Sequence, residues 1–375
     1  MSIAYQHIIL TIRLLFFLAG FALSCWAPLI PIVKNKLQLD EAMLGLMLLC
    51  LGVGSILVMS LSGVLTARFG SRRITILGGI VMALTFPALV FAPNIMVLAF
   101  TLVIFGMALG GLEVAMNVNA IDAEKQLDKS LMSGFHGMFS VGGFIGAGFM
   151  TGLLTLGITA EIAVFLCSLM MLVMITFASK GVLNQQYEDD SPHFMIPRGV
   201  VILLALLAAI IFMAEGAMLD WGGLLMLSKG RINIEQSGLA YMLFAIAMTI
   251  GRFYGDRITS KLGDFNVVLG GGILAALGFV LVIFPEQTAI SLTGFFLIGT
   301  GSSNIVPIIY RRAGSQKLMP VTLAVAGISI FGYGGILIGP TLIGFVADST
   351  SLVTAFMLLA VLWLIVPICA RSITR

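Results

Sequence analysis

The chain has 375 residues, of which 59% are hydrophobic and 10% are charged. An ordinary soluble domain carries about 25% charged residues, so this much apolar surface cannot be hidden in a water-soluble fold of this length. The formal net charge of +3 is small and scattered among hydrophobic runs, which argues against nucleic acid as a partner. We therefore expect an all-α membrane protein with lipid as its solvent.

Apolar runs follow one another from Ile8 to Cys369, and each is long enough for the roughly 20 helical residues that cross a bilayer. The first run is longer than a signal-peptide core and lacks a small-residue cleavage site, so we expect a retained helix there. Twelve transmembrane helices are predicted, at residues 8–33, 42–66, 74–92, 95–121, 131–157, 159–180, 199–228, 236–259, 265–284, 287–311, 321–346 and 350–370.

One long polar stretch separates the sixth span from the seventh. It contains an acidic run at residues 188–190 and is flanked by prolines, a composition typical of a solvated linker. We expect two pseudo-symmetric six-helix bundles, at residues 1–183 and 199–375, joined by a linker at residues 184–198.

Lysine and arginine residues predict the orientation, because they are retained on the cytoplasmic side of loops. With the N-terminus inside, sixteen of the twenty fall at inner ends and loops, and Lys34, Lys36, Lys229 and Arg231 fall outside. We expect a multi-pass protein of the bacterial inner membrane with both termini and the linker in the cytoplasm.

The sequence offers no motif for a metal or a cofactor. The four cysteines all lie inside apolar runs without a Cys-x-x-Cys spacing, which favours buried thiols in helix packing. A phosphate-binding Gly-x-x-x-x-Gly-Lys-Ser/Thr loop is missing from the sequence, so ATP is not expected to drive this protein. We expect no cofactor, no metal site and no enzyme activity.

The two halves repeat each other at matching places. The basic turn GVLTARFGSRR covers residues 63–73, and GRFYGDRITSKLG covers residues 251–263. Span five contains GGFIGAG at residues 142–148, and span eleven contains GGILIGP at residues 334–340. Small residues four apart let helices approach closely, and internal repeats are typical of transporters.

The basic turn, within a pattern of six plus six helices, resembles the major facilitator superfamily over the whole chain. The signature falls on Gly63, Leu65, Arg68, Gly70, Arg72 and Arg73. The family usually has an aspartate where this chain has Ala67. The resemblance implies that the arginines of this turn belong to an inner gate. Because the aspartate is missing, it also implies a weaker latch in this half, with latching shifted toward Asp256 and Arg257 in the second-half copy.

Three further segments are similar to the bacterial YbjJ-like branch, which is related to fucose permease. They are GGLEVAMNVNA at residues 110–120, AEGAMLDWGG at residues 214–223 and GYGGILIGPTLIGFVAD at residues 332–348. Glu113 stands where that branch more often has aspartate. The resemblance implies alternating access, with spans one, four, seven and ten around a cavity, and leaves the substrate open.

Carboxylates inside predicted spans are candidate coupling residues, because a charge near mid-bilayer is costly unless it faces a cavity or a partner. Glu113 and Asn117 are four apart on span four and share one helical face. Burial disfavours the charged form of a carboxyl, so we expect Glu113 to exchange protons. The alternative is a carboxylate that ties two helices together. Glu215, near the middle of span seven, is either a cavity residue or a structural contact.

Other polar residues have weaker signals. His136, near the end of span five, is a candidate proton relay or a hydrogen-bonded structural group. Asp220 and Trp221 precede two glycines that permit a local break, so we expect them to shape an outer gate. Arg13 either snorkels to the headgroups or reaches into the cavity.

A polar solute such as a sugar needs hydrogen-bonding and stacking surfaces. The residues that could supply them are Asn117, Asn304, Trp26, Tyr241, Tyr310 and Tyr333. Aromatic residues near helix ends can equally be interface anchors, which is the alternative for Trp26 and Tyr310.

These features favour a monomeric secondary active transporter of a small polar organic solute, with protons and membrane lipid as further partners. A proton-driven exporter of drugs or amphiphiles is the first alternative, favoured by the Gly339–Pro340 pair and the scarcity of polar groups in the first three spans. A channel or a non-transporting sensor is the second, although a channel would need a repeated polar ring or a carbonyl filter, and the sequence shows neither.

Overall fold

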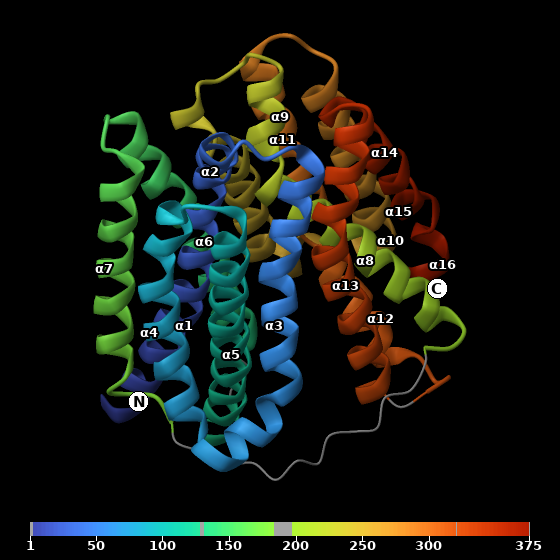
Figure 1. Cartoon of the computed structure of the whole chain (residues 1–375). Helices are drawn as coiled ribbons and strands as arrows, with labels where there is room; N and C mark the ends of the chain where they lie inside the picture. Colours follow the sequence, from blue (N-terminus) through green and yellow to red (C-terminus); the bar gives the residue numbers. More distant parts are fainter. Residues whose placement is uncertain (1–2, 128–130, 184–196, 320, 375) are drawn as a thin grey trace. The chain divides into compact units, whose positions relative to one another are not determined.

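The computed structural model describes residues 3–127, 131–183, 197–319 and 321–374. Every regular element in these ranges is a helix (Figure 1). Eleven of the described helices are long and apolar enough to cross a membrane, and a shorter apolar stretch covers Leu352–Ile368. The expected all-α membrane fold is confirmed. Residues 184–196 of the predicted linker lie outside the described residues.

Helices of the first half follow the predicted spans closely. They are α1 (Ile3–Trp26), η1 (Ala27–Leu29), α2 (Ile30–Leu37), α3 (Glu41–Phe69), α4 (Ser71–Phe91), α5 (Ile95–Leu127), α6 (Met132–Thr155) and α7 (Ala160–Ala178).

Helices of the second half are more often interrupted or merged. They are α8 (Val200–Asp220), α9 (Gly222–Ser228), η2 (Ile234–Gln236), α10 (Leu239–Ile283), α11 (Thr288–Ser302), α12 (Ile305–Ser315), α13 (Val321–Ser349), α14 (Leu352–Trp363), α15 (Ile365–Ile368) and α16 (Ala370–Thr374).

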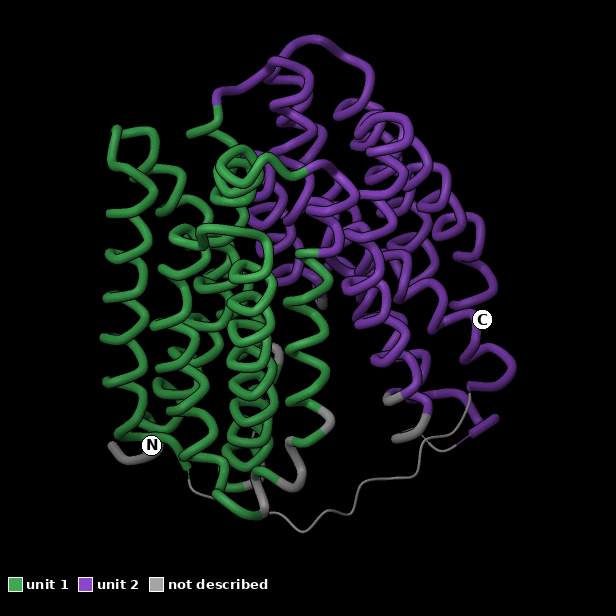
Figure 2. The backbone as a smooth tube through the Cα atoms, in the orientation of Figure 1, with its two compact units in different colours: residues 1–39, 47–191, 234–238 green, residues 40–46, 192–233, 239–375 purple. Residues whose placement is uncertain are grey.

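The chain forms two compact units (Figure 2). Unit 1 comprises residues 1–39, 47–191 and 234–238, and unit 2 comprises residues 40–46, 192–233 and 239–375. The start of α3 therefore groups with unit 2, and η2 groups with unit 1.

Several predicted spans contain breaks. Span one is interrupted by the η1 turn, where Pro28 occupies the start of the turn and Pro31 follows at the start of α2. Span twelve divides into α14, α15 and α16. Pro367 has no N–H to donate to the carbonyl four residues earlier, which accounts for the interruption there. The span remains apolar but is not one continuous helix.

Both predicted basic turns pivot on a glycine with a left-handed backbone. Gly70 has φ 80° and ψ 148° between α3 and α4, and Gly263 has φ 76° and ψ 155° within α10. Only glycine adopts this region without strain. The two turns thus share one backbone geometry, which matches the repeat seen in the sequence.

Close helix packing at the glycine-rich segments is also confirmed. A Cβ atom placed on Gly142 of α6 would lie 2.1 Å from the carbonyl oxygen of Phe17 on α1. One placed on Gly335 of α13 would lie 2.1 Å from the carbonyl oxygen of Ala209 on α8. Side chains at these positions would separate the helices, as expected for small-residue packing.

A lysine follows the break in the first span of each half and caps a helix end. Lys36 at the end of α2 donates from Nζ to the Val90 carbonyl at 2.6 Å, near the C-terminus of α4. Lys229 after α9 donates to the carbonyls of Val282, at 3.3 Å, and Ile283 near the C-terminus of α10. Cations at helix C-termini are favoured by the unsatisfied carbonyls and the helix dipole.

Candidate functional site

The Glu113 side chain lies half-buried on α5, within a membrane-spanning segment. Asn117, one turn later, donates from Nδ2 to the main-chain carbonyl of Glu113 at 2.8 Å. Within the described part of the chain, no hydrogen bond or ion pair reaches the Glu113 carboxylate. A lone carboxylate in a membrane segment is costly. It is tolerated where water reaches it or where it can take up a proton.

Asn119 is a structural residue of α5 that sequence reasoning missed. Its side chain is fully buried, its Nδ2 donates to the Ala115 carbonyl at 2.8 Å, and its Oδ1 accepts from the Leu183 amide at 2.8 Å. Asn119 therefore ties α5 to the segment that follows α7. Asp122, one turn further along, is also buried. No sequence pattern pairs residues 119 and 183, because the contact joins distant segments.

Glu215 on α8 has an ionic partner. Arg252 of α10 donates from Nη2 to Glu215 Oε1 at 3.5 Å, and the two side chains are 31% and 19% exposed respectively. In the sequence, Arg252 was counted only among the basic residues that predict the orientation. Its place inside the predicted span 236–259 was the available signal, because an intramembrane cation needs a nearby anion. The pair is partly open to solvent and joins two helices of unit 2.

Asp220 and Trp221 lie at the break between α8 and α9. Asp220 is half-buried, and among the described residues no hydrogen bond or ion pair reaches its carboxylate. Trp221 is fully buried. A Cβ atom on Gly344 of α13 would lie 3.2 Å from Trp221 Cζ2 and 2.5 Å from the Glu41 carbonyl. Trp221 therefore packs at a tight helix contact.

That contact also includes the start of α3, which belongs to unit 2. Thr341 of α13 donates from Oγ1 to the Gly45 carbonyl at 3.0 Å. Unit 1 contains a comparable contact next to η2, where Ser237 donates from Oγ to the Pro28 carbonyl at 3.1 Å. A Cβ atom on Gly238 would lie 2.0 Å from Thr151 Oγ1. Each contact depends on a glycine at close approach.

His136 is exposed on α6, and its ring makes an edge-on contact with Phe16 of α1, with the ring centroids 5.0 Å apart. Arg13, also on α1, is exposed. His136 is accessible on the surface of unit 1.

Two candidate solute-binding residues make interhelical hydrogen bonds. Asn304, buried between α11 and α12, donates from Nδ2 to the Gly251 carbonyl of α10 and to Ser303 Oγ, each at 3.0 Å. The Tyr310 hydroxyl of α12 lies 2.9 Å from Ser329 Oγ of α13. These contacts join helices of unit 2.

The remaining aromatic candidates differ in access. Trp26 is buried at the end of α1, and its Nε1 has no hydrogen-bond partner among the described residues. Tyr241 is half-buried beside Phe244, with the ring centroids 6.0 Å apart. Tyr333 on α13 is 45% exposed. Tyr241 and Tyr333 have surface to offer, and the Trp26 indole has an unused donor.

The arginines of the first basic turn lie at the surface of unit 1. Arg72 donates from Nη2 to the Ser179 carbonyl at 3.1 Å, at the C-terminus of α7. Arg68 places its guanidinium carbon 5.4 Å from the centroid of the Phe69 ring. Arg73 is exposed. Arg72 thus satisfies a free carbonyl at a helix end, where a cation is favoured.

In the second basic turn, Arg257 is exposed, and the side chain of Asp256 lies outside the described residues. A nearby ion pair joins Arg311 Nη1 of α12 to Asp264 Oδ1, at 2.9 Å. Asp264 directly follows the Gly263 pivot, so this pair anchors the turn to α12. Among the described residues there is no group of three or more metal-binding side chains.

Comparison with known proteins agrees with this architecture. Residues 13–315 match the Major Facilitator Superfamily. The chain is 44% identical over 364 residues to a protein of Yersinia pestis named as an uncharacterised MFS-type transporter, covering 97% of this chain and 95% of that one. It is 29% identical to the membrane protein MosC of Rhizobium meliloti, over 94% of this chain and 86% of MosC.

Solved structures show the same fold. The nucleoside transporter NupG superposes with a TM-score of 0.74 at 12% identity, covering 99% of both chains. The human organic anion transporter MFSD10 (TETRAN) superposes with a TM-score of 0.70 at 14% identity, covering 98% of this chain and 99% of that one. At these identities the likeness concerns the fold alone. With its family match over most of its length, the chain belongs to the Major Facilitator Superfamily and is a transporter rather than an enzyme.

Proposed function

We propose that this transporter is a proton-coupled secondary carrier of a small polar organic solute, such as a sugar or a related metabolite. The observation that carries the proposal is the Glu113 carboxylate, which stands inside α5 without an ionic partner among the described residues. A carboxyl that is neutral when enclosed and ionised when open to water carries one proton per cycle. That exchange links the proton gradient to the change of access.

Glu215 has a different part in this scheme. Its pairing with Arg252 at 3.5 Å joins α8 to α10, and partial exposure lets the two charges separate at modest cost. Protonation of Glu215 would release Arg252 and bias unit 2 toward another arrangement. His136, exposed on α6, is the candidate to relay protons between water and the span.

The solute contacts that we propose require polar or aromatic side chains within the spans. Asn117, Trp26, Tyr241 and Tyr333 fit this requirement, while the hydrogen bonds of Asn304 and Tyr310 suit them to shaping the walls. A site of this kind combines apolar stacking with a few polar groups that fix orientation.

We further propose that alternating access is gated at two levels. Asp220 and Trp221, at the break after α8, would form an outer gate together with the tight contact between Gly344 and the start of α3. The basic turns, with Arg68, Arg72 and Arg73 in one and Asp256 and Arg257 in the other, would form the inner gate. Arg72 already supports this role by capping α7.

The orientation, the division into bundles and the branch complete the proposal. Both termini and residues 184–198 lie in the cytoplasm of a bacterium in this scheme, with six-helix bundles at residues 1–183 and 199–375. The sixteen-to-four bias of basic residues supports it. The similarity of residues 110–120, 214–223 and 332–348 supports membership of the YbjJ-like branch.

The test begins with a thermal-shift screen of the purified protein against sugars, nucleosides, amino acids, organic anions and lipophilic cations. A solute that binds the folded state raises its melting temperature. The best binder is then offered to proteoliposomes with and without a pH gradient. We expect a polar metabolite to stabilise the protein and to accumulate only with the gradient. Selective stabilisation by lipophilic cations, or accumulation that ignores the pH gradient, would contradict the proposal.

A further inference from the structure

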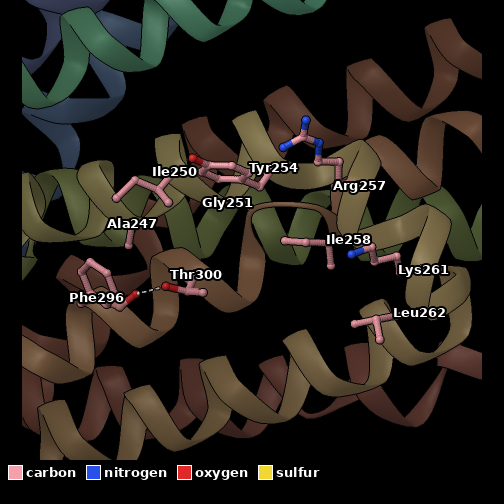
Figure 3. A pocket seen from close by; sticks show the side chains of 10 residues that line it. All are labelled: Ala247, Ile250, Gly251, Tyr254, Arg257, Ile258, Lys261, Leu262, Phe296 and Thr300. Atoms are coloured by element: carbon pink, nitrogen blue, oxygen red, sulfur yellow. Dashed lines mark hydrogen bonds between the residues drawn. The ribbon is translucent and has the colours of Figure 1, made fainter.

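A groove runs along the surface of unit 2 between α10 and α11 (Figure 3). Its volume is about 560 Å³. The residues that line it are Ala247, Ile250, Gly251, Tyr254, Arg257, Ile258, Lys261, Leu262, Phe296 and Thr300. All come from these two helices. The function proposed above uses one of them, Arg257, in the inner gate and assigns no ligand to the groove itself.

Most of the groove is apolar. Ala247, Gly251, Tyr254 and Ile258 recur every three or four residues, so they share one face of α10. The hydroxyl of Thr300 on the opposite wall donates to the Phe296 carbonyl of its own helix at 2.9 Å. The wall therefore presents carbon rather than free hydrogen-bonding groups.

The groove lies away from the Glu215–Arg252 pair. Arg252 is two residues from both Ile250 and Tyr254, so it points about 160° from them around the helix. Ile250 is 49% exposed, Tyr254 54% and Leu262 55%. In a membrane, apolar surface of this kind is covered by lipid chains.

One end of the groove is basic. Arg257 and Lys261 are exposed and one turn apart on α10. Among the described residues neither forms an ion pair. They precede Gly263, where the chain reverses between two membrane-crossing segments, so this end lies at the boundary between hydrocarbon and water. The groove thus combines an apolar channel with two exposed cations at headgroup level.

We propose that this groove binds an anionic phospholipid, with one acyl chain along the apolar floor and the phosphate between Arg257 and Lys261. The dimensions fit, because the eleven-residue rise from Ala247 to Ile258 is about 16 Å. Half of a hydrocarbon core is about 15 Å thick. The charges fit as well, because basic residues near the membrane surface attract anionic headgroups. The inference concerns lipid binding and stands whether or not protons drive transport.

The experiment compares lipids on delipidated protein in detergent. Phosphatidylglycerol and phosphatidylcholine with identical acyl chains are titrated separately, and bound lipid is counted by native mass spectrometry alongside the melting temperature. Soluble glycerol phosphate tests whether a free phosphate suffices. We expect phosphatidylglycerol to bind and stabilise, and the other two compounds to do so weakly.

Variants then separate the contribution of the two cations to lipid binding from that of the apolar channel. Each basic residue contributes about fivefold in affinity, so Arg257→Gln with Lys261→Gln should weaken phosphatidylglycerol binding about twenty-fivefold. The matched control, Lys317→Gln with Arg371→Gln, removes two exposed cations elsewhere in unit 2 and should leave binding unchanged. Ile258→Trp keeps the charges but fills the groove, and should also reduce binding.

Several results would overturn the proposal. Equal binding of the two lipids would show that charge plays no part. Equal binding of glycerol phosphate would show a phosphate site without an acyl channel. If either the double Gln variant or Ile258→Trp binds phosphatidylglycerol as well as the unaltered protein does, the lipid binds outside this groove. A melting temperature near that of the unaltered protein confirms that each variant is folded before its binding is scored.

Discussion

Glu113 on α5 and Glu215 on α8 are the same residue type inside membrane-spanning segments, but their surroundings differ. Glu215 pairs with Arg252 at 3.5 Å, whereas no described ionic partner reaches Glu113. A cationic partner stabilises the ionised form of a carboxylate, and the resulting ion pair holds two helices together. An unpaired carboxylate is free to change its protonation state. The comparison teaches that the presence of an ionic partner, rather than depth in the membrane alone, distinguishes the surroundings of the two carboxylates.

Removing the ionic partner of Glu215 should remove the difference between the two carboxylates, and it is expected to have the largest effect on stability. Arg252→Met leaves a carboxylate unpaired between α8 and α10, and we expect a loss of about 2 kcal/mol, since removal of one member of a buried pair costs about 3–5 kcal/mol and this pair is partly exposed. Thermal unfolding of the purified variant measures the loss.

Adding Glu215→Gln to Arg252→Met is the control, because it removes the stranded charge. We expect the double variant to regain most of the stability lost by the single one. If the double variant is no more stable than Arg252→Met, the contact is not an ion pair that matters for folding.

Two neighbouring asparagines sharpen the comparison on the Glu113 side. Asn117 and Asn119 each donate to the carbonyl four residues earlier, but only Asn119 also accepts from the Leu183 amide. Asn119→Ala leaves that amide without its acceptor, so we expect a loss of about 1.5 kcal/mol. Asn117→Ala removes only a bond within its own helix and should cost under about 0.5 kcal/mol.

Unfolding of both variants under one set of conditions gives the difference directly. Equal losses would mean that the bond to Leu183 contributes little, and that the α5 segment around Glu113 is held by other contacts.

The last comparison concerns the capping lysines, which are cations that bind helix ends rather than carboxylates. Lys36→Met should cost about 0.5–1 kcal/mol through the lost bond at the end of α4. Desolvation, and secondarily the positive charge of Arg231, lower the pKa of Lys229. The charged ammonium that caps the helix is therefore disfavoured at this position, which reduces the net stabilisation by the cap. We expect Lys229→Met to cost less than Lys36→Met. Melting temperatures of the two variants test the order, and the reverse order would contradict it.

Much of the fold could be predicted from the sequence, because apolar length places spans without reference to tertiary contacts. The two basic turns were visible as a repeat, and Gly70 and Gly263 give them one geometry. Breaks were harder. Pro28 and Pro367 signal interruptions, and so does Pro307, the third residue of α12, which has no N–H to donate to the Ser303 carbonyl between α11 and α12.

The candidate site was predictable only in part. Carboxylates within apolar runs stand out, so Glu113 and Glu215 were found as single residues. The difference between their surroundings could not be predicted, because the partner of Glu215 lies 37 residues away on another helix. A contact of this kind produces no periodic pattern in the sequence. Asn304 and Tyr310 show the same limit, since polar side chains suited to a solute can equally tie two helices together.

The central claim is that Glu113 carries the coupling proton, and transport by the Glu113→Gln variant in proteoliposomes tests it most directly. Glutamine keeps the shape and most hydrogen bonding but cannot titrate. For the solute found by thermal shift, we predict that pH-gradient-driven accumulation is lost while counterflow exchange stays within about twofold of the unaltered protein. Glu113→Asp, which keeps a carboxyl, should retain accumulation. If the Gln variant still concentrates solute against its gradient, Glu113 is structural and the account is contradicted.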